Sequence, residues 1–225
     1  MLSSSSVVVP SAITAASVSR FSKLVKKIGT SPSSIADEIR QRKARKKKSS
    51  QVLKEINKYT GALGMRPISI TLTYRDNADY SSKHISAFID KCRRWAKQKG
   101  YPLPYIWVLE SAGRLHYHCT VWLPVSLKVD LAKLEKWWKW GTTWIQECRC
   151  IRRWGSYITK FNDPATSLPK GARLFGYGGV DSATKQKIAR GSWPVWLRDA
   201  IPIGEHAKRL KGGGWVNLET GEVLF

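Results

Sequence analysis

Two apolar runs with a very short connection constrain this fold more than any other feature of the chain. Residues 103–110 read LPYIWVLE and residues 114–123 read RLHYHCTVWL, with Ser111, Ala112 and Gly113 between them. Both runs are rich in β-branched and aromatic residues, and glycine readily takes the positive backbone angle that short hairpin loops require. We therefore predict two antiparallel strands joined by a three-residue loop that ends at the glycine.

The segments around this hairpin alternate between the two periods of regular structure. Helical segments repeat their apolar residues every three to four positions, whereas the strand segments are short and rich in β-branched residues. The order strand, helix, strand, strand, helix, strand, helix predicts an α+β fold, with a mainly antiparallel central sheet and helices packed on it. Strands are expected at 66–74, 103–110, 114–123 and 142–150, and helices at 81–100, 126–141 and 151–161.

Composition divides the chain into three parts. Residues 1–60 are serine-rich, basic and poor in apolar residues, so we expect a mostly disordered arm with a short helix at 51–59. Residues 61–162 hold the predicted strands and helices of the core. Residues 163–225 are expected to be a loop-rich extension of the same domain that ends in a hairpin turning at 219–221.

The chain is strongly basic, with a formal net charge of +23. Residues 1–60 carry a net +10 and residues 61–225 a net +13, so the core is basic without the arm. Such a balance indicates a polyanionic partner. The apolar stretch from Val7 to Val18 is too short and too interrupted to span a membrane, so no membrane partner is expected. The basic run from Arg40 to Lys48 is expected to contact phosphates.

The hairpin contains a candidate metal site. His116 and His118 are two positions apart on one strand, so their side chains share a face and can bind one ion. A three-residue loop would place Glu110 opposite Arg114, on the histidine face and diagonal to His116. Two imidazoles and one carboxylate suit a divalent ion acting as a Lewis acid, with zinc and magnesium both compatible. The alternatives are histidines packed in a core and a surface salt bridge from Glu110 to Arg114.

A candidate nucleophile lies further along the chain, in the segment WGSYITKF. Tyr157 and Lys160 are three positions apart on a predicted helix, which makes them neighbours on one face. A nearby ammonium group favours the phenolate form of tyrosine and can also neutralise a phosphate. The alternative is an ordinary amphipathic helix face.

Three short motifs occur in an order that resembles the HUH endonucleases, the rolling-circle replication initiators of plasmids and single-stranded DNA phages. They are SITLTY at 69–74, HYH at 116–118 and YITK at 157–160. The segments LPKGARLFGYGG at 168–179 and GGGWVNLETGEVLF at 212–225 are similar to the replication proteins of filamentous phages (inoviruses). The resemblance covers roughly residues 65–225.

The resemblance implies a nuclease fold of the ferredoxin or RRM-like type and a nicking and joining activity. Tyr157 would attack single-stranded DNA at a replication origin, leaving a 5′-phosphotyrosine and a free 3′-OH. Lys160 would assist the tyrosine or the leaving oxygen. The metal, Mg²⁺ or Mn²⁺, would be held by His116, His118 and Glu110.

The resemblance also implies partners. No glycine in the chain is followed by lysine, so a P-loop is absent and a host helicase would unwind the DNA for a host polymerase. The expected location is the cytoplasm of a bacterial host. One tyrosine on the helix implies the one-tyrosine class, so joining would need a second copy, a second round of attack or another tyrosine such as Tyr177. The alternatives are a HUH transposase or relaxase, although relaxases commonly use three histidines, and a non-catalytic DNA-binding protein.

Basic and aromatic residues beside the tyrosine and in the tail are candidates for DNA contact, because aromatic faces stack on unpaired bases. We expect Trp95, Trp107 and Trp122 in the core, and Trp193, Trp196 and Trp215 near DNA. The other candidates are Arg152, Arg153, Trp154, Arg190, Arg198, Lys208, Arg209 and Lys211.

Overall fold

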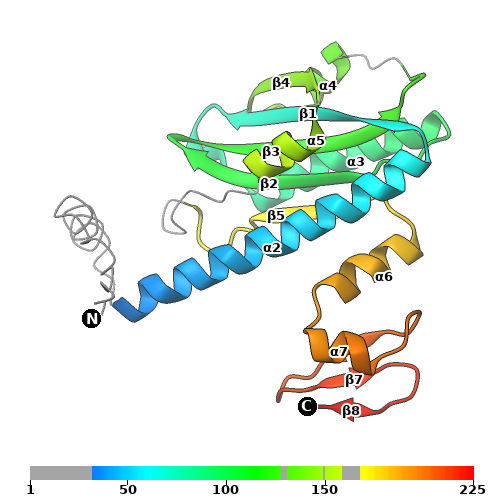
Figure 1. The fold of residues 1–225 in the computed structure, drawn as a ribbon. Helices are drawn as coiled ribbons and strands as arrows, with labels where there is room; N and C mark the ends of the chain where they lie inside the picture. The colour runs from blue at the N-terminus through cyan, green and yellow to red at the C-terminus, as the bar shows by residue number, and fades with distance from the viewer. Residues whose placement is uncertain (1–31, 128–130, 149, 159–167) are drawn as a thin grey trace, which may run out of the picture. The chain divides into compact units, whose positions relative to one another are not determined.

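A five-stranded antiparallel sheet forms the centre of the structure, a computed structural model that describes residues 32–127, 131–148, 150–158 and 168–225. The strand order is β4-β1-β3-β2-β5, so the β2–β3 hairpin lies inside the sheet and β4 at one edge (Figure 1). This arrangement confirms the predicted α+β fold. The strands are β1 (Met65–Tyr74), β2 (Tyr105–Ala112), β3 (Arg114–Pro124), β4 (Gly141–Glu147) and β5 (Phe175–Gly178).

The three helices predicted in the core are present. Helix α3 (Ser82–Gln98) begins at the Ser81 cap, whose side chain accepts a hydrogen bond from the backbone N–H of Lys83. Helix α4 (Leu131–Trp137) ends earlier than predicted, and α5 (Ile151–Ile158) follows β4. The early end of α4 has a packing reason, because Trp138 is buried and donates its indole N–H to the carbonyl of Thr73.

The two faces of the sheet have separate cores, as the alternation in β3 predicts. Tyr117, Cys119, Val121 and Leu123 face the core that contains buried residues of α3. Trp122 and Ile106 face the opposite core, which contains Val52 and Ile56 of α2 (Pro32–Ala62). His116 and His118 alternate with the first set, so they lie on the second face.

Helix α2 corrects the prediction for the arm. Residues 32–60 were expected to be mostly disordered with a short helix at 51–59, but one helix runs from Pro32 to Ala62. Arginine, lysine, alanine and glutamine are good helix formers, and Val52, Leu53 and Ile56 place an apolar stripe against the sheet. The chain divides into units of residues 1–41 and 42–225, and all packing described below belongs to the second unit.

The C-terminal part is more regular than predicted. Beyond β5 it forms α6 (Ser182–Gly191), α7 (Val195–Ala200) and a second sheet of β6 (Ala207–Arg209), β7 (Trp215–Asn217) and β8 (Val223–Leu224). The predicted terminal hairpin is confirmed as β7–β8, with Gly221 at φ +75° in its turn. A small core of Trp193, Leu197 and Ile201 supports this sheet. In the described ranges, no helix combines the length and apolar character needed to cross a membrane.

Candidate active site

The register of the β2–β3 hairpin differs from the prediction by two residues. Glu110 pairs directly with His116 and Ala112 pairs with Arg114, so Gly113 alone connects the paired positions. Gly113 has φ +79°, a conformation that glycine adopts without strain. A shift of two residues keeps every side chain on its predicted face, so Glu110 still lies with the histidines, opposite His116 rather than diagonal to it.

Asn77, which no sequence motif singles out, holds this turn. Its side-chain amide donates to the carbonyl of Gly113 at 3.2 Å, and its carbonyl oxygen accepts from the backbone N–H of Leu115 at 2.7 Å. The two bonds bracket the connection between the strands that carry Glu110 and His116. Asn77 is therefore a positioning residue for the hairpin.

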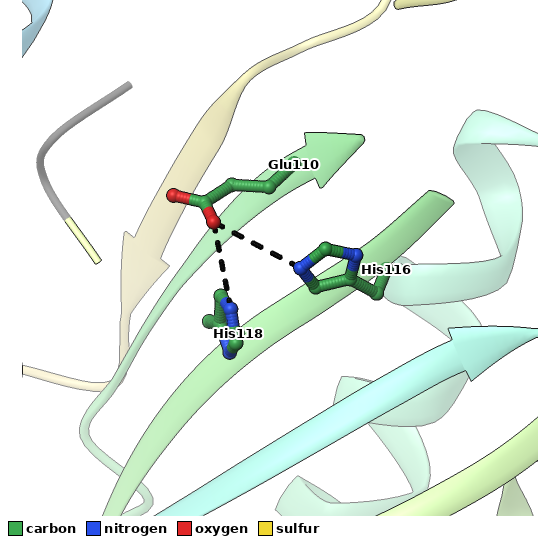
Figure 2. A group of neighbouring side chains, drawn as sticks. All are labelled: Glu110, His116 and His118. Carbon is green, nitrogen blue, oxygen red and sulfur yellow. Dashed lines mark ion pairs between the residues drawn. The ribbon is translucent and has the colours of Figure 1, made fainter. Parts of the chain in front are cut away.

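Glu110, His116 and His118 converge on one point (Figure 2). Glu110 Oε2 lies 3.8 Å from His116 Nε2 and 3.5 Å from His118 Nε2, and one ligand atom from each residue lies within 4.8 Å of the others. Ligand atoms that share one ion at bond lengths of about 2.0–2.2 Å lie roughly 3–4 Å apart. Within the described residues Glu110 pairs with the imidazoles, so the alternative of a salt bridge to Arg114 does not hold.

The hydrogen bonds around the histidines leave their Nε2 atoms for a ligand. His116 Nδ1 lies 2.9 Å from the carbonyl oxygen of Arg114, which can only accept, so Nδ1 carries the proton and the Nε2 lone pair faces Glu110. His118 Nδ1 lies 3.2 Å from the hydroxyl of Thr71, and His118 Nε2 is buried without a hydrogen-bond partner among the described residues. Lone pairs and a carboxylate repel one another unless a positive charge lies between them. The three residues therefore fit a divalent cation.

Tyr157 lies beside this cluster. Its ring centroid is 5.4 Å from that of His118 and 5.7 Å from that of Trp154, on which it stacks at 25°. Trp154 in turn donates its indole N–H to the buried hydroxyl of Thr120 at 2.7 Å. The helix is thus fastened to β3, and Tyr157 remains 49% exposed and accessible to a substrate. Lys160 falls outside the described residues.

Helix α5 also lies very close to α2, which explains a glycine in a helix. A Cβ atom on Gly155 would meet Leu53 Cδ2 at 2.1 Å. Two hollows flank α5. One, of about 710 Å³, contains Tyr157 and Arg153 together with Ser69 and Gln146 of the sheet. The other, of about 360 Å³, lies between α2 and α5 and is lined in part by Lys46, Lys54, Ser50, Asn57, Arg152 and Ser156.

The predicted DNA contacts fall into two groups. Arg152 and Arg153 are exposed on α5 next to Tyr157, whereas Trp154 is half-buried and supports the tyrosine. In the C-terminal part, Arg190 donates to the carbonyls of Pro202 and Arg198 and covers the Trp193 ring, so it has a structural role. Arg198, Lys208, Arg209 and Lys211 are exposed there.

The tryptophans follow the predictions in part. Trp107 and Trp122 are buried in the core as expected, and Trp95 packs against Trp137. Trp193, expected near DNA, is buried and packs near Trp215. An exposed tryptophan that the sequence did not single out, Trp144, lies in β4.

Comparison with known proteins supports the family resemblance. Residues 67–163 match the family model described as replication-associated protein ORF2. The matched segment contains Glu110, His116, His118 and Tyr157. No curated protein and no solved structure gives a significant match.

Proposed function

We propose that this chain, whose residues 67–163 match the family of replication-associated protein ORF2, nicks and joins single-stranded DNA at a replication origin. The observation that carries the proposal is the convergence of Glu110, His116 and His118 with the ring of Tyr157 beside them. This arrangement combines a divalent-cation site with an accessible nucleophile, which is the minimum needed for metal-dependent phosphodiester transfer.

In the proposed reaction the phenolic oxygen of Tyr157 attacks the scissile phosphorus. The bond from phosphorus to the 3′ oxygen breaks, the DNA 5′ end becomes a phosphotyrosine, and the 3′ oxygen leaves and gains a proton. Attack by a 3′-OH on the phosphotyrosine reverses these bond changes and joins strands. A divalent cation, Mg²⁺ or Mn²⁺, held by Glu110, His116 and His118 would neutralise charge on the phosphate.

The chain's own residues orient the reacting groups. Trp154 holds the Tyr157 ring by stacking and is itself fixed by the Thr120 hydroxyl. Thr71 and the carbonyl of Arg114 fix the two imidazoles, so that each presents Nε2 to the cluster. We assign to Lys160 the role of assisting the tyrosine or the leaving oxygen, which its place one turn beyond Tyr157 in the sequence supports.

Positive charge around α5 suits the DNA backbone. Lys46, Lys54 and Arg152 surround the hollow between α2 and α5, and none of them has a carboxylate partner in the part of the chain that the structure describes. Arg153 lies on the adjacent side of α5, in the hollow that contains Tyr157. We assign these cations to phosphates that flank the attacked one.

The wider setting belongs to the same proposal. A host helicase and a host polymerase in the cytoplasm of a bacterial host would act with this chain, and a second copy would complete joining if one tyrosine serves each cut. Tyr177 is a poor substitute, because it pairs with Ile106 on β5 and packs against the core beneath α2. A non-catalytic DNA-binding protein would account for the charge but would not require the converging ligands.

The test is covalent capture. The protein is incubated with Mn²⁺ and a mixed-sequence pool of single-stranded oligonucleotides, and the products are separated under denaturing conditions. We expect a DNA–protein adduct that disappears with EDTA and in a His116→Ala, His118→Ala double variant. An adduct of equal yield in EDTA would contradict the metal site. The lack of any adduct with origin-derived strands would contradict the nicking activity.

A further inference from the structure

An exposed tryptophan lies on the same face of the sheet as the candidate active site. Trp144 pairs with Thr71 across β4 and β1, and Thr71 pairs with His118 across β1 and β3. Residues directly opposite one another in antiparallel strands share a face. Since the hydroxyl of Thr71 contacts His118 Nδ1, the Trp144 indole projects from the face that carries the histidines.

The neighbouring residues of β4 agree with this orientation. Ile145 packs against the core on the opposite face, and the exposed positions alternate as Thr142, Trp144 and Gln146. Trp144 is 68% exposed, the highest exposure of any aromatic side chain other than Phe225 among the described residues. An indole of this size on an edge strand has no packing role that would explain its exposure.

The space between Trp144 and the nucleophile is hollow. Gln146, the next residue on the same side of β4, lines the hollow of about 710 Å³ that also contains Arg153 and Tyr157. Ligand sites for small molecules commonly have volumes of about 300–1,000 Å³, so a nucleotide fits. Strands β4 and β3 are two strand spacings apart, about 10 Å. A base resting on Trp144 would therefore lie close to the phosphate that Tyr157 attacks.

We propose that Trp144 stacks against an unpaired base of the substrate strand, next to the scissile phosphate. The inference rests on the proposed function, since it takes single-stranded DNA as the ligand. The formal charge of +23 and Arg153 in the adjoining hollow favour a polyanion over an apolar protein partner. Glu147, the carboxylate of this hollow, is paired with Arg66 and does not oppose a phosphate there.

The test separates base stacking from backbone contact. Binding of an oligodeoxythymidine and of an abasic strand of equal length is measured by fluorescence anisotropy in EDTA, for the wild type and for Trp144→Ala and Trp144→Phe. We expect Trp144→Ala to weaken oligodeoxythymidine binding about five-fold to a hundred-fold, the loss of one base stack, and to leave abasic binding unchanged. Trp144→Phe should restore most of the loss, and the salt dependence should not change, because no phosphate contact is removed.

Tyr101→Ala is the matched control, since Tyr101 is an exposed aromatic residue that precedes β2, at the end of the strand remote from Glu110. The control should bind both strands like the wild type. Equal preference for oligodeoxythymidine over the abasic strand in the wild type and Trp144→Ala would overturn the inference. Because binding is measured without metal, this result is independent of whether the Mn²⁺ reaction gives an adduct, so the two proposals can fail separately.

Discussion

The ring of Tyr157 lies 5.4 Å from the ring of His118, edge-on at 73°. The two residues come from a helix and a strand that are well separated in the sequence, and Trp154 contacts both rings. This contact places a potential nucleophile next to a potential metal ligand. The catalytic account depends on it more than on any single residue identity.

Replacing Glu110 by glutamine should weaken metal binding. Glu110→Gln keeps the size of the side chain but removes the negative charge that lies 3.5 Å and 3.8 Å from the two imidazole nitrogens. We expect Mn²⁺ affinity to fall roughly tenfold or more, measured by titration calorimetry. Glu135→Gln on the exposed side of α4 is the control and should bind Mn²⁺ like the wild type. Unchanged affinity in Glu110→Gln would remove this carboxylate from the site.

The hydroxyl of Thr71 should tune the same site without binding the ion. It lies 3.2 Å from His118 Nδ1, so Thr71→Val removes the partner that orients this imidazole while keeping the shape of the side chain. Outer partners of this kind typically change metal affinity about 10–100-fold. Thr73→Val, two residues further on the same face of β1, should have no such effect. The same calorimetric titration distinguishes the two variants.

The bond between Trp154 and Thr120 should stabilise the position of α5. In Thr120→Val the indole N–H of Trp154 loses its acceptor at a buried site, which costs about 1–3 kcal/mol of unfolding free energy. Denaturant unfolding measures this loss. A double variant that also carries Trp154→Phe removes donor and acceptor together, so its destabilisation should be less than the sum of the single changes. Strict additivity would show that the two groups do not interact.

An acid-sensitive contact is expected in the C-terminal sheet. Hydrogen bonds from the His206 side chain and backbone hold the pKa of Glu219 below its ordinary value of 4.5. A lowered pKa in the folded state means that this contribution is fully present above the ordinary carboxyl pKa. It is lost as the pH falls through the lowered value. Thermal unfolding of Glu219→Gln should therefore approach that of the wild type as the pH falls below 4.5.

The face of each side chain in the hairpin could be predicted because alternation along a strand is strict, and a register error of two residues does not alter it. The order of the core elements followed from local periodicity in the same way. The direct pairing of Glu110 with His116 could not be predicted, since it depends on how tightly the chain turns at Gly113. That turn is held by Asn77, whose contribution arises only from the tertiary structure.

The length of α2 and the importance of Trp144 were missed for related reasons. The basic run resembles a disordered tail by composition, but three apolar residues anchor the helix to a sheet that lies later in the chain. Trp144 is one of eleven tryptophans, and the sequence does not distinguish those that pack in a core from those that are exposed. Its relation to His118 follows from two strand pairings that involve separate segments.

The identity of the residue linked to DNA tests the central claim most directly. Protein incubated with Mn²⁺ and single-stranded DNA is digested, and the peptide that carries the nucleotide is sequenced by mass spectrometry. The account predicts attachment at Tyr157, with no adduct from Tyr157→Phe, undiminished DNA binding by that variant and a normal adduct from Tyr177→Phe. An adduct that persists in Tyr157→Phe, or that maps to another residue, would contradict it.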